Sequence, residues 1–101
     1  MSAYLLAFVR THDEESLNRE YMMQAHAIVT KHGGKALVAT ENIRAMEGCL
    51  PEGRMVIVEF PSMENAEEFY ADPDYQPLIE TRKKYSESDA VIFDKGLVPE
   101  A

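Results

Sequence analysis

Glu59 is the carboxylate of this sequence whose position favours acid–base chemistry. Glu59 follows a short apolar run, and alternation along an extended chain places it on the same face as Met55 and Ile57. A buried carboxylate is costly unless it is paired, and burial raises the pKa of a carboxyl group toward values useful for proton transfer. The sequence therefore predicts Glu59 as a catalytic residue. The alternative is structural: Glu59 lies at the strand end, in water or paired with an arginine.

Arginine and tyrosine side chains predict a second chemistry, the binding of a small ligand that carries an oxygen. The planar guanidinium groups of Arg54, Arg82 and Arg10 match the geometry of a carboxylate. Arg82 follows Tyr75 by seven residues, so the two share one helix face. With Tyr70, they are predicted to anchor an anionic or phenolic ligand at the edge between helices and sheet. In the alternative, Arg82 pairs with a local acid and the tyrosines belong to the core.

Histidine and cysteine spacing argues against a metal site. His26 and His32 are six residues apart, so they point in different directions on a helix. Cys49 is the single cysteine, which leaves no CxxC ligand pair and no internal disulfide. We expect no metal and no cofactor; haem stays open, although no axial ligand stands out. His26 alone is interpreted as a partly buried helix residue.

Length, charge and cysteine content limit the classes of partner and compartment. The chain has 101 residues, which suits one domain, and 46% of them are hydrophobic, so it is expected to fold. The formal net charge of -8 disfavours nucleic acid and anionic membranes as partners. The apolar run at residues 3–9 is too short to span a bilayer. With a single cysteine, these features predict a cytoplasmic protein.

The first half of the chain is expected to begin with a strand over residues 3–10, followed by an amphipathic helix with apolar residues every three or four positions. The helix N-cap is either Thr11, three residues before Glu14 as in a capping box, or Asp13. The Gly33-Gly34 pair is predicted to end the helix, because glycine accepts the left-handed backbone of a C-cap.

A second extended segment is predicted over residues 35–47, with a bend or bulge at residues 40–42 where the apolar pattern breaks. The strand that contains Glu59 follows it. Pro61 is expected to end this strand, because proline cannot donate a hydrogen bond to a sheet ladder.

The second half continues with a helix that is capped by Ser62 and interrupted at Asp72-Pro73. The last strand is predicted at residues 90–93. We interpret residues 1–96 as a single ferredoxin-like domain and residues 97–101 as a C-terminal tail.

The resulting order β-α-β-β-α-β predicts an α+β ferredoxin-like fold with a four-stranded antiparallel sheet. Right-handed crossovers place both helical segments on one side of the sheet. The predicted strands are apolar on both faces, and a bare apolar sheet face is larger than the patches that monomers usually expose. We therefore expect a homodimer whose two sheets pack face to face as a dimeric α/β barrel.

Several short motifs occur together in a known family. They are Gly33-Gly34-Lys35, Glu59-Phe60-Pro61-Ser62, Asp72-Pro73-Asp74-Tyr75-Gln76, Arg82 and Asp89. On these residues the chain resembles the domain of unknown function 1330 family of the dimeric α/β-barrel group. The resemblance spans Tyr4 to Gly96 and is most specific from Glu59 to Gln76.

The resemblance implies a homodimeric, bacterial ferredoxin-like protein, and it implies no established activity. More distant dimeric α/β-barrel proteins include cofactor-free monooxygenases, isomerases and haem enzymes, so analogy of fold leaves the chemistry open. One departure concerns a ligand. Relatives often carry an arginine and a glycine pair where this chain has Ala39-Thr40-Glu41, so a ligand held by that arginine is not implied here.

Two functions remain at this point. In the first, a homodimer binds a small organic molecule in a partly apolar pocket of each subunit and acts on it without a cofactor, by isomerase-like or monooxygenase-like acid–base chemistry. In the second, the protein is a non-catalytic dimeric binding or structural module. A Glu59→Gln exchange separates them, because it removes turnover in the first case and affects only stability in the second.

Overall fold

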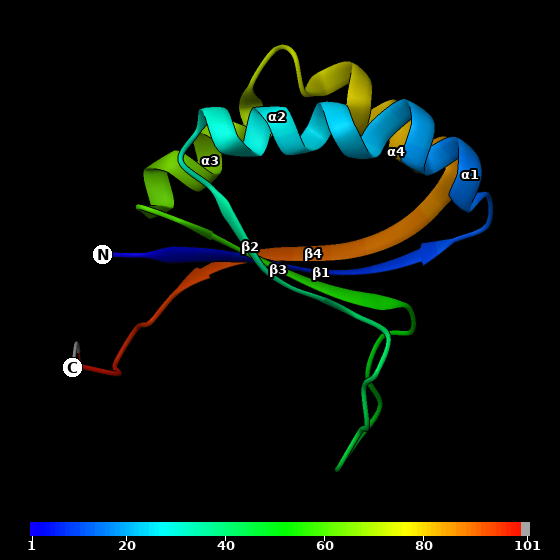
Figure 1. Cartoon of the computed structure of the whole chain (residues 1–101). Coiled ribbons are helices and arrows are strands. Elements are labelled where there is room, and N and C mark those ends of the chain that lie inside the picture. Colours follow the sequence, from blue (N-terminus) through cyan, green and yellow to red (C-terminus); the bar gives the residue numbers. More distant parts are fainter. Residues whose placement is uncertain (100–101) are drawn as a thin grey trace.

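The computed structural model describes residues 1–99 and contains one four-stranded antiparallel sheet in the order β2-β3-β1-β4. The strands are β1 (Ala3–Thr11), β2 (Lys35–Thr40), β3 (Arg54–Phe60) and β4 (Ser86–Asp94). The helices cover one face of this sheet, and the opposite face carries none (Figure 1). The predicted α+β ferredoxin-like fold is therefore confirmed.

The first helical segment consists of α1 (Glu14–Leu17), a π-helical turn η1 (Asn18–Met22) and α2 (Met23–Lys31). Of the two N-cap alternatives, the cap is Asp13, whose carboxylate accepts a hydrogen bond from the Ser16 backbone N–H at 3.1 Å. Gly33 ends the segment with a φ of +78°, as predicted.

The second helical segment is divided into α3 (Met63–Ala71) and α4 (Gln76–Tyr85). The Ser62 hydroxyl caps α3, because it accepts a hydrogen bond from the Asn65 backbone N–H at 3.1 Å. Pro77 lies in the first turn of α4, where its missing N–H removes no intrahelical hydrogen bond. The predicted end of β3 before Pro61, the Ser62 cap and the interruption at Asp72-Pro73 are all confirmed.

Two predictions about strand limits were wrong. β2 ends at Thr40, so the predicted continuation to residue 47 is absent, whereas the predicted bend at residues 40–42 is confirmed at Glu41. A register shift between Ala36 and Val38 was not predicted. The Asn42 backbone N–H turns back to the Thr40 hydroxyl at 3.0 Å, which ends the ladder with β3. β4 begins at Ser86, four residues before the predicted start, because its first residues pair with the far end of β1.

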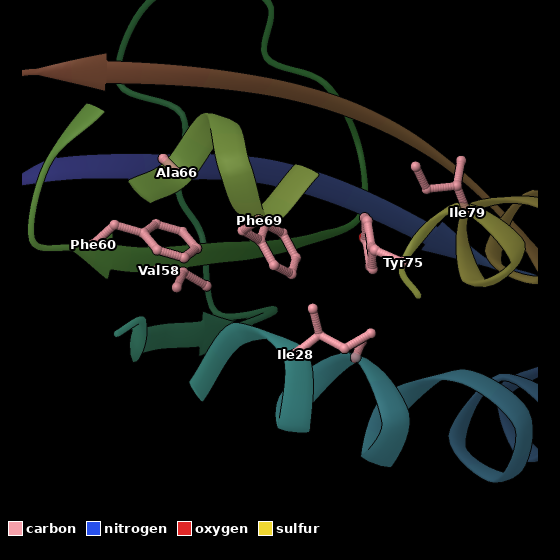
Figure 2. Packing of buried hydrophobic residues seen from close by; sticks show 8 residues of the cluster. Ile28, Val58, Phe60, Ala66, Phe69, Tyr75 and Ile79 are labelled. Atoms are coloured by element: carbon pink, nitrogen blue, oxygen red, sulfur yellow. The ribbon is translucent and has the colours of Figure 1, made fainter. Parts of the chain in front are cut away.

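The hydrophobic core lies between the helices and the covered face of the sheet (Figure 2). Phe60 is 0% exposed, and its ring centroid lies 5.4 Å from that of Phe69 on α3. A Cβ atom added to Gly34 would lie 2.8 Å from the Phe60 ring and 2.6 Å from the Val29 side chain. Gly34 therefore serves close packing, whereas Gly33 beside it serves the turn.

The helix-free face of the sheet is also apolar. Strand alternation puts Leu6 of β1 and Ile57 of β3 on this face, where they are register partners. Tyr4 and Phe93 stack on it with ring centroids 5.5 Å apart, and Phe93 is 38% exposed. We call this surface the open face.

The chain beyond β4 turns immediately. The Gly96 backbone N–H binds the Asp94 side chain, and the Val98 backbone N–H binds the Lys95 carbonyl. The division into a domain of residues 1–96 and a tail of residues 97–101 stays a prediction, and residues 100 and 101 lie outside the described residues. Within residues 1–99, no helix is long and apolar enough to cross a membrane.

Candidate functional site

A cavity of about 230 Å³ lies between the helices and the covered face of the sheet. Most of its wall is aliphatic and comes from β1, β2, β3 and the first helical segment. The titratable side chains in the wall are Tyr21, His26, Arg54, Tyr70, Tyr75 and Arg82, and Thr11 and Ser88 add hydroxyl groups. This composition, an apolar pocket with a few convergent polar groups, is typical of small-molecule sites.

The four residues predicted to bind a ligand all line this one cavity: Arg54, Tyr70, Tyr75 and Arg82. The structure thus brings them together from β3 (Arg54), the end of α3 (Tyr70), and the N-cap and body of α4 (Tyr75 and Arg82). Their role in binding stays a prediction. Glu59 does not line the cavity. It alternates with the core residues Val58 and Phe60 and therefore lies on the open face, on the other side of the sheet.

Tyr75 joins Tyr21 and Arg82 into one hydrogen-bonded polar group in the cavity wall. It is 2% exposed, its hydroxyl oxygen lies 2.6 Å from that of Tyr21, and it accepts a hydrogen bond from Arg82 Nη1 at 3.1 Å. Burial raises the pKa of Tyr75, and Tyr21 raises it further, whereas Arg82 acts in the opposite direction. Tyr75 is therefore a neutral hydrogen-bond donor at physiological pH, not a phenolate.

Arg82 has no carboxylate partner among residues 1–99, in contrast to the predicted structural alternative of a pair with a local acid. Its Nε atom is buried without a hydrogen-bond partner. Burial lowers the pKa of Arg82, but the phenolic oxygens of Tyr75 and Tyr21 raise it more, so the guanidinium stays charged. A partly buried cation without an anion is costly, and an anionic ligand would remove that cost.

Arg54 differs from Arg82 because its guanidinium is already occupied. Its Nη2 atom lies 2.9 Å from the Glu14 carboxylate and 3.6 Å from that of Glu41. The hydrogen bond to Glu14 raises the pKa of Arg54. Arg54 thus ties the start of α1 and the segment after β2 to the start of β3, and it borders the cavity as one member of an ion-pair cluster.

Sequence reasoning missed two cavity residues. Tyr21 lies in the π-helical turn η1, and such turns occur frequently at functional sites, but the sequence carries no clear signal for one. His26 is exposed, not partly buried as predicted, and it lines the cavity together with Met22 and Val29. A signal for His26 was available in the sequence. The spacing of four and three residues places Met22, His26 and Val29 on one helix face, next to the face that carries the buried Ala25 and Ile28.

A second polar cluster, around Asp72, lies outside the cavity wall. The Asp72 carboxylate is 3% exposed and accepts hydrogen bonds from His32 Nε2 at 2.7 Å, Lys31 Nζ at 3.0 Å and the Asp74 backbone N–H at 2.8 Å. These contacts join the end of α2 to the junction between α3 and α4. The hydrogen bond from His32, followed by those from Asp74 and Lys31, holds the pKa of Asp72 well below its usual range.

We expect Asp72 to support the folded state at neutral pH and to lose that effect in acid. Below pH 3.8 the unfolded chain binds a proton at this carboxyl before the folded protein does, so the free energy of unfolding falls as the pH falls. Urea titrations between pH 7 and pH 2.5 should show a stability gap between wild type and Asp72→Asn that narrows in acid. The neighbouring, exposed Asp74→Asn is the control, and a gap independent of pH would contradict the linkage.

These features define a class: a ferredoxin-like α+β protein with a mostly apolar cavity between helices and sheet and a tyrosine–arginine group in its wall. The chain belongs to the family described as Domain of unknown function (DUF1330), whose model matches residues 2–95. The expected family membership is thereby confirmed. No curated protein matches the chain.

Solved structures with the same fold include three informative neighbours. The RPA0582 protein of unknown function from Rhodopseudomonas palustris is 20% identical with a TM-score of 0.73, covering 97% of this chain and 84% of its own. SnoaB, a cofactor-independent oxygenase from Streptomyces nogalater, is 15% identical with a TM-score of 0.59 and 98% of each chain covered. A dimeric protein of unknown function from Bacteroides fragilis is 12% identical with a TM-score of 0.58, covering 92% and 95%. At these identities the likeness concerns the fold.

Proposed function

We propose that the cavity binds a small organic molecule with an apolar body and one anionic or strongly hydrogen-bond-accepting oxygen. The observation that carries this proposal is Arg82, a charged guanidinium in the cavity wall that has no carboxylate partner within residues 1–99 and has a buried, unbonded Nε atom. The aliphatic wall accommodates the body of the ligand, and Arg82 with Tyr75 binds its oxygen. Tyr70 and Arg54 complete the polar part of the wall.

Cofactor-free chemistry on this ligand is part of the proposal. The cavity contains proton donors and a charged group, and one neighbour of the same fold is a cofactor-independent oxygenase. The role of Glu59 in proton transfer stays a prediction. Its place on the open face separates it from the cavity of its own subunit by the sheet, so Glu59 acts, if the prediction holds, at a different surface. The alternative, a non-catalytic module, has the same cavity without turnover.

The open face supports the homodimer. Leu6, Ile57 and Phe93 are apolar residues on a surface that no helix within residues 1–99 covers (Figure 1). The loop between β2 and β3 projects on the same side, and it carries the 89% exposed Met46 (Figure 1). A second copy packed sheet against sheet would bury both, and one neighbour of this fold is dimeric. This arrangement is the predicted dimeric α/β barrel.

The ligand-binding proposal is tested with 4-nitrophenolate and the variant Arg82→Met, which keeps much of the side-chain volume and removes the charge. A hydrogen bond to a charged group contributes about 1.5–3 kcal/mol, so the dissociation constant is expected to rise about 10–150-fold. Isothermal titration calorimetry measures it. Arg19→Met, at an exposed arginine that does not line the cavity, is the matched control. Equal affinity of wild type and Arg82→Met would sink the assignment of Arg82, and no binding by either would contradict the proposed ligand class.

A further inference from the structure

We propose that the cavity is a site of proton transfer at carbon, in which the His26 imidazole is the base and the Tyr21–Tyr75–Arg82 group holds the oxygen of an enolisable carbonyl compound. This inference rests on the proposed function, since it assumes that the cavity binds an oxygen-bearing organic molecule. It adds the class of substrate, the type of reaction and a catalytic residue that sequence reasoning did not select.

The choice of His26 follows from the composition of the wall. No aspartate or glutamate lines the cavity in the part of the chain that the structure describes. Arg54 and Arg82 are charged, and Tyr75 is held in its neutral form by burial. An imidazole nitrogen is the side-chain group that is available as a base near neutral pH without special surroundings. His26 is the imidazole in the cavity wall.

The His26 ring is free to act on a ligand. Among residues 1–99 it has no hydrogen-bond partner, and the contact from the Thr30 hydroxyl goes to the His26 backbone carbonyl. His26 is exposed while it lines the cavity, so it lies where the cavity meets solvent. A base at this position can take a proton from a bound molecule and exchange that proton with water.

Proton transfer also requires hydrogen-bond donors for the negative charge that develops on the carbonyl oxygen. A count of the protons in the Tyr21–Tyr75–Arg82 group shows that such donors are available. The hydroxyls of Tyr21 and Tyr75 hold two protons, and one of them is used in their mutual 2.6 Å hydrogen bond. Arg82 donates to the Tyr75 oxygen, so the second hydroxyl proton is left for an outside acceptor. The unbonded Arg82 Nε–H is a further donor. Such preorganised donors stabilise an oxyanion more strongly than a neutral carbonyl.

The reaction balances without a co-reactant. The His26 nitrogen takes a proton from the carbon next to the carbonyl, the C–H electron pair forms a carbon–carbon double bond, and the carbonyl π pair moves to oxygen. The resulting enolate is held by the hydroxyl proton and the guanidinium. His26 then returns the proton to the same carbon, which gives exchange with solvent, or to a conjugated one, which gives isomerisation.

The test follows acetophenone in deuterated water, because this probe has one oxygen, an apolar ring and an enolisable methyl group. Proton NMR measures two quantities: saturable binding, from ligand line broadening, and loss of the methyl signal as deuterium enters. The wild type is expected to bind acetophenone and accelerate exchange. His26→Asn is expected to bind it with unchanged affinity and to lose about 100-fold or more of the exchange rate. His12→Asn, at an exposed histidine outside the cavity wall, is expected to retain the wild-type rate.

Each other outcome contradicts a specific statement. Binding without accelerated exchange overturns proton transfer and leaves the proposed function intact. Accelerated exchange that His26→Asn retains overturns the assignment of the base. Absence of binding overturns the proposed function and this inference together. Because His26 is exposed, the variant is expected to fold, and its circular dichroism and melting temperature should match the wild type.

Discussion

Replacing Phe60 by alanine is expected to lower the free energy of unfolding by about 3–5 kcal/mol, the range for large aromatic residues in a packed core. Phe60 is 0% exposed, and it contacts Phe69 on α3 while the chain at Gly34 passes directly beside its ring. Its loss opens a void where the first helical segment, α3 and β3 meet. The free energy of unfolding of such domains is only about 5–15 kcal/mol, so the exchange is expected to remove a large fraction of it.

Urea unfolding followed by circular dichroism measures this loss, with all proteins at one concentration because dimerisation adds to apparent stability. Phe60→Leu is the matched control, since it keeps most of the apolar volume and is expected to cost less than about 1.5 kcal/mol. If Phe60→Ala and Phe60→Leu were equally stable, the described packing around Phe60 would be wrong.

Placing a lysine at Ile57 is expected to convert a homodimer into a monomer. Ile57 lies on the open face beside its β1 partner Leu6, so a two-fold interface on this face brings two introduced charges into a desolvated, apolar surface. Juxtaposed like charges cost several kcal/mol, and every 1.4 kcal/mol weakens association about tenfold. We expect the dissociation constant of the dimer to rise at least about 100-fold.

Sedimentation velocity at micromolar concentration reads out this change. Ala27→Lys introduces the same charge at an exposed position of α2, on the helix side, and is expected to leave the dimer intact. A wild-type protein that sediments as a folded monomer would contradict the dimer outright. A dimeric Ile57→Lys would show that the interface lies elsewhere.

The sheet separates the proposed ligand-binding cavity from the proposed dimer interface, and Glu59 lies on the interface side. The cavity lies on the helix side, whereas Glu59 and Ile57 share the open face. A defect in association therefore need not alter the Tyr75–Arg82 group, and the loss of Arg82 need not alter association. Measurements of ligand binding on Ile57→Lys and of sedimentation on Arg82→Met distinguish these surfaces.

The order of elements was determined by the sequence itself, because the signals are local. The Ser62 cap, the stop at Pro61 and the positive φ of Gly33 each depend on one residue and its immediate neighbours. Strand limits were less well predicted where pairing with a distant strand decides them, as at the start of β4. The ligand-binding residues Tyr75 and Arg82 could be proposed together because a fixed helical spacing joins them.

Tertiary structure decided the rest of the site. Tyr21 and Tyr75 are 54 residues apart, and no local rule predicts that their hydroxyls meet at 2.6 Å. Only the packed fold shows that Arg82 lacks an acidic partner in the described part of the chain while Arg54 has two, and that His26 lines a cavity. These contacts join residues that are far apart in the sequence. They form only when the helices pack on the sheet and exclude water from the region between them. Residue types determined what chemistry was feasible, and packing determined which groups can perform it together.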